Sequence, residues 1–191
     1  TGTDDERTAE AQFRDVAGNV SSICQDTIVL DRTPPRCSIT IADGASYTIQ
    51  PTVTLTISGS DSNGVAQMRF RQDGADWTDW EPYTTTYTWS LAMPDGLQTL
   101  SAQVRDTPGN VSDACADSIT LDTTPPTGFE IINGGTLYTG IPTVTLTLGA
   151  SDVNGVSHMR FSNTGATWSA WRAYDVSMPW ALVNGDGLKT V

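Results

Sequence analysis

The sequence is short of basic residues and of long apolar runs. Of its 191 residues only 10 are lysine or arginine, against 22 aspartate or glutamate, so the formal net charge is −12. Nucleic acid and anionic lipid surfaces are bound through clustered positive charge, which makes both poor candidates as partners. No apolar run approaches the roughly 18–20 residues of a membrane-spanning helix. We therefore expect no nucleic-acid partner and no membrane insertion.

The sequence also lacks a recognisable catalytic constellation. Histidine occurs once, as His158, and a lone imidazole forms neither a catalytic triad nor a metal site. The carboxylates recur at predicted turns and do not converge from several elements, as glycosidase chemistry requires. The glycine-rich turns lie between predicted strands, whereas phosphate loops precede helices. We predict that the chain is not an enzyme.

What the sequence does contain is an internal repeat with an offset of 91 residues and no gap. Residues 33–100 align on 124–191 with 32 identities in 68 positions, and residues 1–32 align on 92–123 with 15 identities in 32 positions. Self-similarity at one fixed period indicates a tandem array of a single module.

The repeat divides the chain into one whole module and two partial ones. Residues 1–31 correspond to the C-terminal strands of a preceding module, 32–122 to a complete module, and 123–191 to the N-terminal part of a following module. The sequence has no initial methionine and no signal peptide, as expected of a chain that begins inside a copy. A stiff Thr-Pro-Pro link at each boundary predicts a semi-rigid rod.

The complete module is predicted to consist of short strands. Thr52–Ile57 alternates threonine with apolar residues, which directs Val53, Leu55 and Ile57 to one face. Similar alternating segments follow, separated by Asp-Gly and Asn-Gly turns, and no window shows a helical period. We predict an all-β fold of tandem antiparallel β-sandwich modules. The predicted core of the complete module consists of Val53, Leu55, Met68, Phe70, Trp89, Val104 and Leu121.

Two recurring motifs carry a family resemblance. Residues 15–21 (Asp-Val-Ala-Gly-Asn-Val-Ser) recur at 106–112 (Asp-Thr-Pro-Gly-Asn-Val-Ser), each followed by a strand and an Asp-x-Thr-Pro-Pro link. The run from Met159 to Trp171 is equally typical. These motifs resemble bacterial and archaeal Ig-like, or fibronectin-III-like, repeats of large extracellular or cell-surface proteins. The resemblance implies a tandem Ig-like fold and an extracellular or cell-surface location, and it specifies no ligand.

The resemblance also bears on the three cysteines. Opening and closing strands of Ig-like sandwiches often run side by side, which would bring Cys37 and Cys115 within disulfide distance. Cys24, the counterpart of Cys115 one period earlier, would then pair with a cysteine outside this sequence. A Cys24–Cys37 bond, intermolecular crosslinks and free thiols remain as alternatives. A disulfide would indicate an oxidising compartment.

Six tryptophans suggest two interpretations. Trp77, Trp80 and Trp89 recur one period later, so the module itself requires them, and large aromatic residues commonly fill small cores. Alternatively, Trp77 and Trp80 could stack on a sugar. Buried rings would favour the packing role, and an exposed coplanar pair would favour sugar binding.

Acidic turns near the predicted junctions raise the question of calcium. Calcium prefers six to eight oxygen ligands at one point, whereas each turn offers only two or three, and aspartate also caps turns through backbone amides. No other cofactor is expected. The calcium candidates are Asp15, Asn19, Asp31, Asp106, Asn110 and Asp122.

Together these features predict a structural extracellular repeat protein that forms a semi-rigid rod or filament, as a surface fibre, stalk or spacer. The alternative is an adhesin or a carbohydrate-binding accessory module of a secreted enzyme. The expected partners are further copies of the repeat, supplied in cis or by neighbouring protomers in trans. A glycan is the partner expected under the carbohydrate-binding alternative. Separately, Asn19 and Asn110 begin formal N-glycosylation sequons, although the turns explain the same residues.

Overall fold

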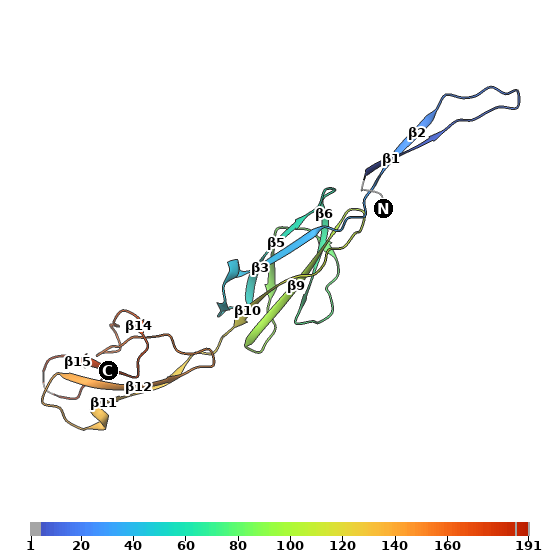
Figure 1. The fold of residues 1–191 in the computed structure, drawn as a ribbon. Coiled ribbons are helices and arrows are strands. Elements are labelled where there is room, and N and C mark those ends of the chain that lie inside the picture. Colours follow the sequence, from blue (N-terminus) through green and yellow to red (C-terminus); the bar gives the residue numbers. More distant parts are fainter. Residues whose placement is uncertain (1–4, 186, 191) are drawn as a thin grey trace. The chain divides into compact units, whose positions relative to one another are not determined.

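The computed structural model describes residues 5–185 and 187–190, and its regular secondary structure is almost entirely β-strand (Figure 1). The chain divides into two compact units, Thr1–Thr123 and Thr124–Val191, which are described separately here. The first unit contains β1 (Asp5–Ala11), β2 (Cys24–Leu30), β3 (Arg36–Ile41), the 3₁₀ turn η1 (Ala42–Gly44), β4 (Tyr47–Thr48), β5 (Thr52–Ser60), β6 (Val65–Gln72), β7 (Glu81–Pro82), β8 (Thr86–Ser90), β9 (Gly96–Asp106) and β10 (Cys115–Leu121). The second contains β11 (Thr127–Ile132), the 3₁₀ turn η2 (Asn133–Gly135), β12 (Thr143–Ser151), β13 (His158–Met159), β14 (Arg172–Ala173) and β15 (Ser177–Ala181).

Strands β3 to β10 form a sandwich of two sheets. One sheet has the order β3-β5-β8 and the other the order β4-β10-β9-β6-β7. All pairs are antiparallel except β4 with β10, which run parallel. The prediction of an all-β sandwich of mainly antiparallel strands is confirmed.

The core lies between these two sheets, where the alternating apolar residues meet. Leu55, Phe70 and Leu121 are completely buried, while the threonines of β5 are exposed, as a strand with one solvent-facing side requires. Of the predicted core residues, Val53, Leu55, Met68, Phe70, Val104 and Leu121 are buried.

Trp89 departs from the predicted core, because its side chain is only half-buried and packs against the edge of the core. Its indole Nε1–H donates to Gln72 Oε1 at 3.0 Å. A buried indole N–H needs a hydrogen-bond partner, and the ring reaches one by staying at the rim.

A tyrosine hydroxyl after β7 forms hydrogen bonds with the backbone of β5. Tyr83 Oη accepts from the backbone N–H of Gly59 at 2.8 Å and donates to the Ile57 carbonyl oxygen. In the second unit Tyr174 Oη accepts from the N–H of Ala150 at 2.9 Å. The two pairs are separated by 91 residues, so the repeated sequence produces the same anchor twice.

The second unit contains only part of this architecture. Its bounds for β11, η2, β12 and β15 lie 91 residues after those of β3, η1, β5 and β8. Strands β11-β12-β15 form one sheet, and β13 pairs only with β14. Within the described residues of this unit, no strand corresponds to β9 or β10.

Strands β1 and β2 form an antiparallel hairpin that pairs with no other strand among the described residues. Every residue of both strands is exposed. Its register matches that of β9 with β10: Ala11 lies opposite Cys24, as Ala102 lies opposite Cys115. The hairpin is thus the 91-residue counterpart of the β9–β10 pair, without a sandwich to cover.

Candidate functional site

A disulfide links the two sheets of the sandwich. Cys37 on β3 and Cys115 on β10 are bonded, with their Cα atoms 5.6 Å apart. Both side chains are half-buried and pack against the core. Cys24 is a free, exposed thiol. The bond therefore connects the opening strand of the module to its closing strand.

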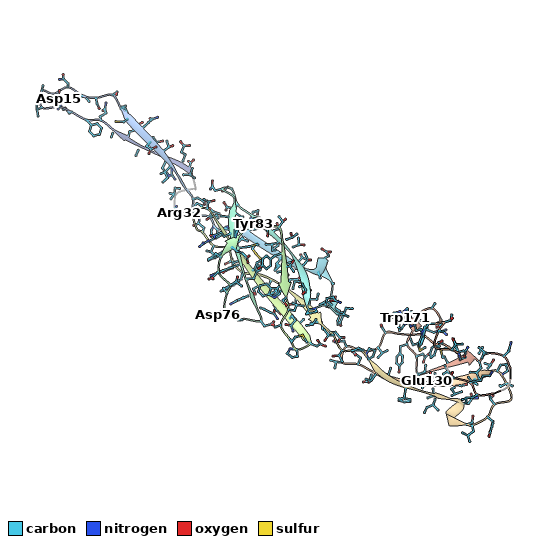
Figure 2. All side chains as sticks on the ribbon, turned by 180° about the vertical axis from the view of Figure 1, so that it is seen from behind. Asp15, Arg32, Asp76, Tyr83, Glu130 and Trp171 are labelled. Atoms are coloured by element: carbon cyan, nitrogen blue, oxygen red, sulfur yellow. A yellow bond between two sulfur atoms is a disulfide. The ribbon has the colours of Figure 1, made fainter. Side chains whose placement is uncertain are left out.

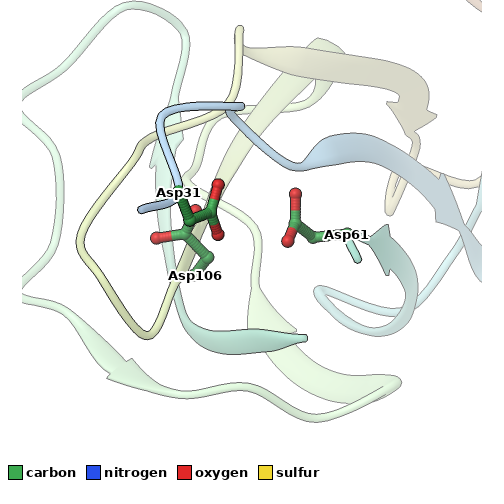
Figure 3. A group of neighbouring side chains, drawn as sticks. All are labelled: Asp31, Asp61 and Asp106. Carbon is green, nitrogen blue, oxygen red and sulfur yellow. The ribbon is translucent and has the colours of Figure 1, made fainter. Parts of the chain in front are cut away.

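The main candidate for a functional site is a group of three carboxylates at the start of the module (Figure 3). Asp31 precedes β3, Asp61 follows β5, and Asp106 ends β9. One carboxylate oxygen of each lies within 4.8 Å of the others. Asp31 and Asp106 are buried, with exposed fractions of 7% and 2%.

Amide groups of two neighbouring loops hold these carboxylates in place. Asn63 Nδ2 donates to Asp31 Oδ2 at 2.8 Å, and its backbone N–H donates to Asp61 Oδ1. Asp106 Oδ1 accepts from the backbone N–H of Asn110, and Asp106 Oδ2 from its Nδ2. Asn110 Nδ2 also reaches the carbonyl oxygen of Asp31 at 3.2 Å. Through these bonds, the link that contains Asp31 is attached to the loop of Asn63 and to the loop of Asn110.

The structure brings together only some of the calcium candidates that the sequence offered. Asp31 and Asp106 do come together, with Asn110 beside them, but the third carboxylate is Asp61, which was not among the candidates. Asp122 is not part of the group, because it lies one period after Asp31 and so corresponds to the next junction. A signal for Asp61 existed, since Asp-x-Asn-Gly recurs at 61–64 and 152–155.

Asp15 and Asn19 show the same turn in isolation, at the tip of the β1–β2 hairpin (Figure 2). The Asn19 side chain and its backbone N–H each donate to Asp15 at 2.8 Å. These bonds, the side-chain one first, lower the pKa of Asp15. Aspartate capping thus accounts for both turns, and calcium binding at either stays a prediction, to be tested by melting the protein with calcium and with a chelator.

Replacing Asp106 by alanine should lower the free energy of unfolding of the module by about 2–3 kcal/mol. The change removes the carboxylate that the N–H groups of Gly109 and Asn110 contact at 2.7 Å, and a hydrogen bond to a charged group contributes about 1.5–3 kcal/mol. Chemical denaturation followed by tryptophan fluorescence measures this change in the free energy of unfolding. Asp15→Ala is the matched control, because it removes the same turn bonds from an exposed hairpin. Equal effects of the two substitutions would contradict a role for the buried network.

Alternating arginine and tryptophan side chains lie on the outer face of β6 and β9. Arg71 and Arg69 lie over the Trp77 ring, with Cζ atoms 4.6 and 4.9 Å from its centroid. Arg69 and Arg105 lie over the Trp80 ring, each at 4.5 Å. The resulting order is Arg71, Trp77, Arg69, Trp80, Arg105. Guanidinium groups this close occupy the space in which a sugar would stack on Trp77 or Trp80.

The second unit repeats only the middle of this stack. Arg160 lies over both Trp168 and Trp171, at 4.9 and 4.5 Å. The position of Arg71 is taken by Ser162. Trp168 and Trp171 are exposed, by 50% and 61%, and Figure 2 shows Trp171 at the surface of its unit. Both units have one arginine between the two rings, but in the second unit no flanking arginine corresponding to Arg71 or Arg105 contacts a ring among the described residues.

We expect Arg69→Ala to lower the free energy of unfolding by about 1–2 kcal/mol, since Arg69 contacts two rings and partly desolvated cation–π pairs are worth up to about 2 kcal/mol. The substitution also removes its hydrogen bonds to Gln103 Oε1. Thermal and urea unfolding measure the change. Arg36→Ala, at the exposed first position of β3, is the control, expected to stay within about 0.5 kcal/mol of the parent. If both variants lost a similar free energy of unfolding, the arginine–tryptophan stack would make no contribution to stability.

The sequence of the sandwich matches the model of a known protein family. Residues 35–105 match the family model of the bacterial Ig domain. The match runs from the Pro-Pro link through β9, which is most of the Ig module described above. Ig modules are typically non-catalytic. The described residues contain no helix with the length and hydropathy needed to cross a membrane.

Several solved structures are also similar to the chain. The PKD domain of an M14-like peptidase from Thermoplasmatales archaeon SCGC AB-540-F20 is 16% identical with a TM-score of 0.40, covering 48% of this chain and 98% of that one. Fibronectin(III)-like modules of Clostridium thermocellum CbhA are 14% identical with a TM-score of 0.39, covering 63% and 64%. A tetra-tandem repeat from the extending region of a large adhesion protein is 18% identical with a TM-score of 0.38, covering 95% and 49%. No curated protein matches the sequence.

Proposed function

We propose that this chain is a structural repeat protein of the cell exterior, whose Ig modules form a semi-rigid rod or filament that serves as a surface fibre, stalk or spacer. The observation that carries the proposal is the anchoring of Asp31. Its side chain and its carbonyl oxygen are bonded to Asn63 and Asn110, so the link into the module is held by two loops. With its first residue buried and bonded to two loops, and with a double proline after it, this link resists bending more than a freely solvated one would.

The location rests on the family and on the disulfide. Disulfides persist in oxidising compartments such as the cell exterior, and the Cys37–Cys115 bond joins the two sheets of a bacterial Ig module. Both features fit a secreted or surface protein. The excess of acidic residues, with a net charge of −12, keeps such a chain soluble and disfavours unspecific contact with anionic polymers.

The alternative function, an adhesin or a carbohydrate-binding accessory module, receives support only from the second unit. There Trp168 and Trp171 are exposed, and exposed aromatic rings can stack on sugars. Titration with soluble polysaccharides, followed by tryptophan fluorescence, separates the two functions. Saturable binding that is lost in Trp171→Ala would favour the alternative, and its absence favours the rod.

The rod is tested by spin-label distance measurements at high dilution. One label sits on the free thiol of Cys24, which is exposed on the hairpin, and the other on Asp76→Cys in the exposed loop after β6. We expect a narrow distance distribution that broadens in Asp31→Ala, with Asp26→Ala on β2 as a control without effect. A broad distribution in the parent protein would overturn the proposal.

A further inference from the structure

The outer face of the larger sheet of the Ig module carries positive charge and no carboxylate. Alternating burial along β6, β9 and β10 shows which side chains point away from the core. The chain has 22 acidic residues, but the outward positions of these strands hold only arginine, glutamine, serine, threonine, alanine and leucine. We call this surface the arginine face, after its residues Arg69, Arg71 and Arg105. It is a cationic surface on an acidic protein.

The three arginines of this face have no acidic partner among the described residues. Arg69 donates from Nε and Nη2 to Gln103 Oε1. Arg105 donates from Nε to Gln67 Oε1. Arg71 makes no hydrogen bond to a described residue, and its Nε is buried without an acceptor. Since a guanidinium group has five N–H donors, most donors of the arginine face are left for a ligand.

The guanidinium groups form a row that follows β6. Arg69 and Arg71 are two residues apart on this strand, and Arg105 of β9 is in register with the position two residues before Arg69. Two residues of a strand span about 7 Å, so three positive charges follow one another at this spacing. The rings of Trp77 and Trp80 lie between them. The indoles therefore cover the guanidinium faces and leave the N–H edges, which pair with carboxylates.

Neutral polar side chains occupy the face beside the arginines. Ser101 lies opposite Arg71 in the sheet, and the hydroxyls of Thr99 and Ser118 are 3.0 Å apart on the next positions. Strand β9, in the middle of the face, is paired on both sides, so it offers no free edge to which a peptide strand could add. Cationic edges next to hydroxyl groups match a ligand that carries both carboxylates and hydroxyls.

We propose that the arginine face binds an acidic polysaccharide, whose uronate carboxylates contact the three arginines while its hydroxyls contact Ser101 and the polar side chains beside it. The net charge of −12 does not prevent this contact, because exposed charges more than about 8 Å away are largely screened at physiological ionic strength. The contact differs from ring stacking in the second unit, since it requires a charged sugar and does not involve Trp171. It goes beyond the rod and does not depend on it.

Calorimetric titration with an oligogalacturonate tests the class of ligand. The matched probe is the methyl ester of the same oligomer, which has the same sugars without charged carboxylates. A chelator is present throughout, so that no divalent cation bridges the protein and the glycan. We expect saturable binding of the acid form, which weakens as salt is added and is lost with the ester. No binding of the acid form, or equal binding of both forms, would overturn the proposal.

Arg71→Gln tests the position of the site. It removes a charge from one end of the row and should weaken binding at least about tenfold, the loss expected for one charge-assisted pair. Arg36→Gln is the matched control, because it removes the same charge from the exposed first position of β3 in the other sheet. Equal affinities of these two variants would exclude the arginine face.

Arg71→Lys keeps the positive charge but loses the planar fork of donors, so its affinity should lie between those of the parent and Arg71→Gln. Urea unfolding shows whether each variant is folded. If Arg71→Gln does not fold, the lysine variant decides, since an affinity equal to that of the parent would contradict pairing of a carboxylate with the guanidinium edge.

Poly-L-glutamate distinguishes an acidic polysaccharide from an acidic peptide. It carries carboxylates on a flexible backbone and has no sugar hydroxyls. At equal carboxylate concentration we expect it to bind at least about tenfold more weakly than the oligogalacturonate. Equal or tighter binding that is lost in Arg71→Gln would assign the arginine face to acidic peptides and refute the assignment to a glycan.

Discussion

Replacing both Cys37 and Cys115 by alanine should lower the free energy of unfolding of the Ig module by about 4 kcal/mol. The bond joins residues that are 78 positions apart, so it closes nearly the whole module into one loop. In the chain-entropy model, a loop of this length removes enough freedom from the unfolded chain to account for about 4–5 kcal/mol. Urea unfolding of the double variant, followed by tryptophan fluorescence, measures the difference.

Two controls accompany this measurement. Cys24→Ser removes the exposed free thiol and should leave the stability of the module unchanged. Adding a reductant to the parent protein should reproduce the loss seen in the double variant. A bond between Cys24 and Cys37 in non-reducing peptide maps, or a stability that reductant does not affect, would rule out this account.

Leu55→Ala should cost about 2–5 kcal/mol, the range measured for large-to-small substitutions in well-packed cores. Leu55 is completely buried on β5, the central strand of its sheet, where it lies opposite Ile41 and Tyr87. Neighbours on both sides are held by strand pairing and cannot collapse freely into the space that the side chain leaves. The loss should appear as a lower urea midpoint with an unchanged slope.

Thr54→Ala is the matched control for Leu55→Ala. Thr54 is the adjacent residue on the same strand, but its side chain is exposed, so its replacement should change stability by no more than about 0.5 kcal/mol. If the two substitutions cost the same, the assignment of the inner and outer faces of β5 would be wrong.

The face assignments could be made from sequence because the alternation in this chain is strict. Val53, Leu55 and Ile57 occupy every second position of β5, and all three are buried. Strand periodicity leaves a single way to bury such a set. Leu100, Ala102 and Val104 on β9 follow the same rule. The absence of a helical period agrees with the described residues, in which the only helical elements are two 3₁₀ turns.

The candidate site could be predicted only in part, because it depends on which loops share one end of the sandwich. Asp31 and Asp106 are recognisable as turn residues, but local sequence does not say that Asp61 joins them. The stacking of the tryptophan rings with arginine side chains could not be predicted from the sequence either. The alternation of buried Met68 and Phe70 along β6 puts Arg69 on the outer face, but its position between the Trp77 and Trp80 rings results from the path of the loop after β6.

The disulfide also determines how the module responds to a pull along the chain. Between Cys37 and Cys115 lie 78 positions of polypeptide, or roughly 260–280 Å of fully extended chain. A force that enters at β3 and leaves at β10 is transmitted through the sulfur atoms, so this length stays locked even if the core opens. The second unit has Gly128 at the position of Cys37 and lacks this covalent bypass. Under load the first module therefore acts as an inextensible segment, and the second is the part that yields.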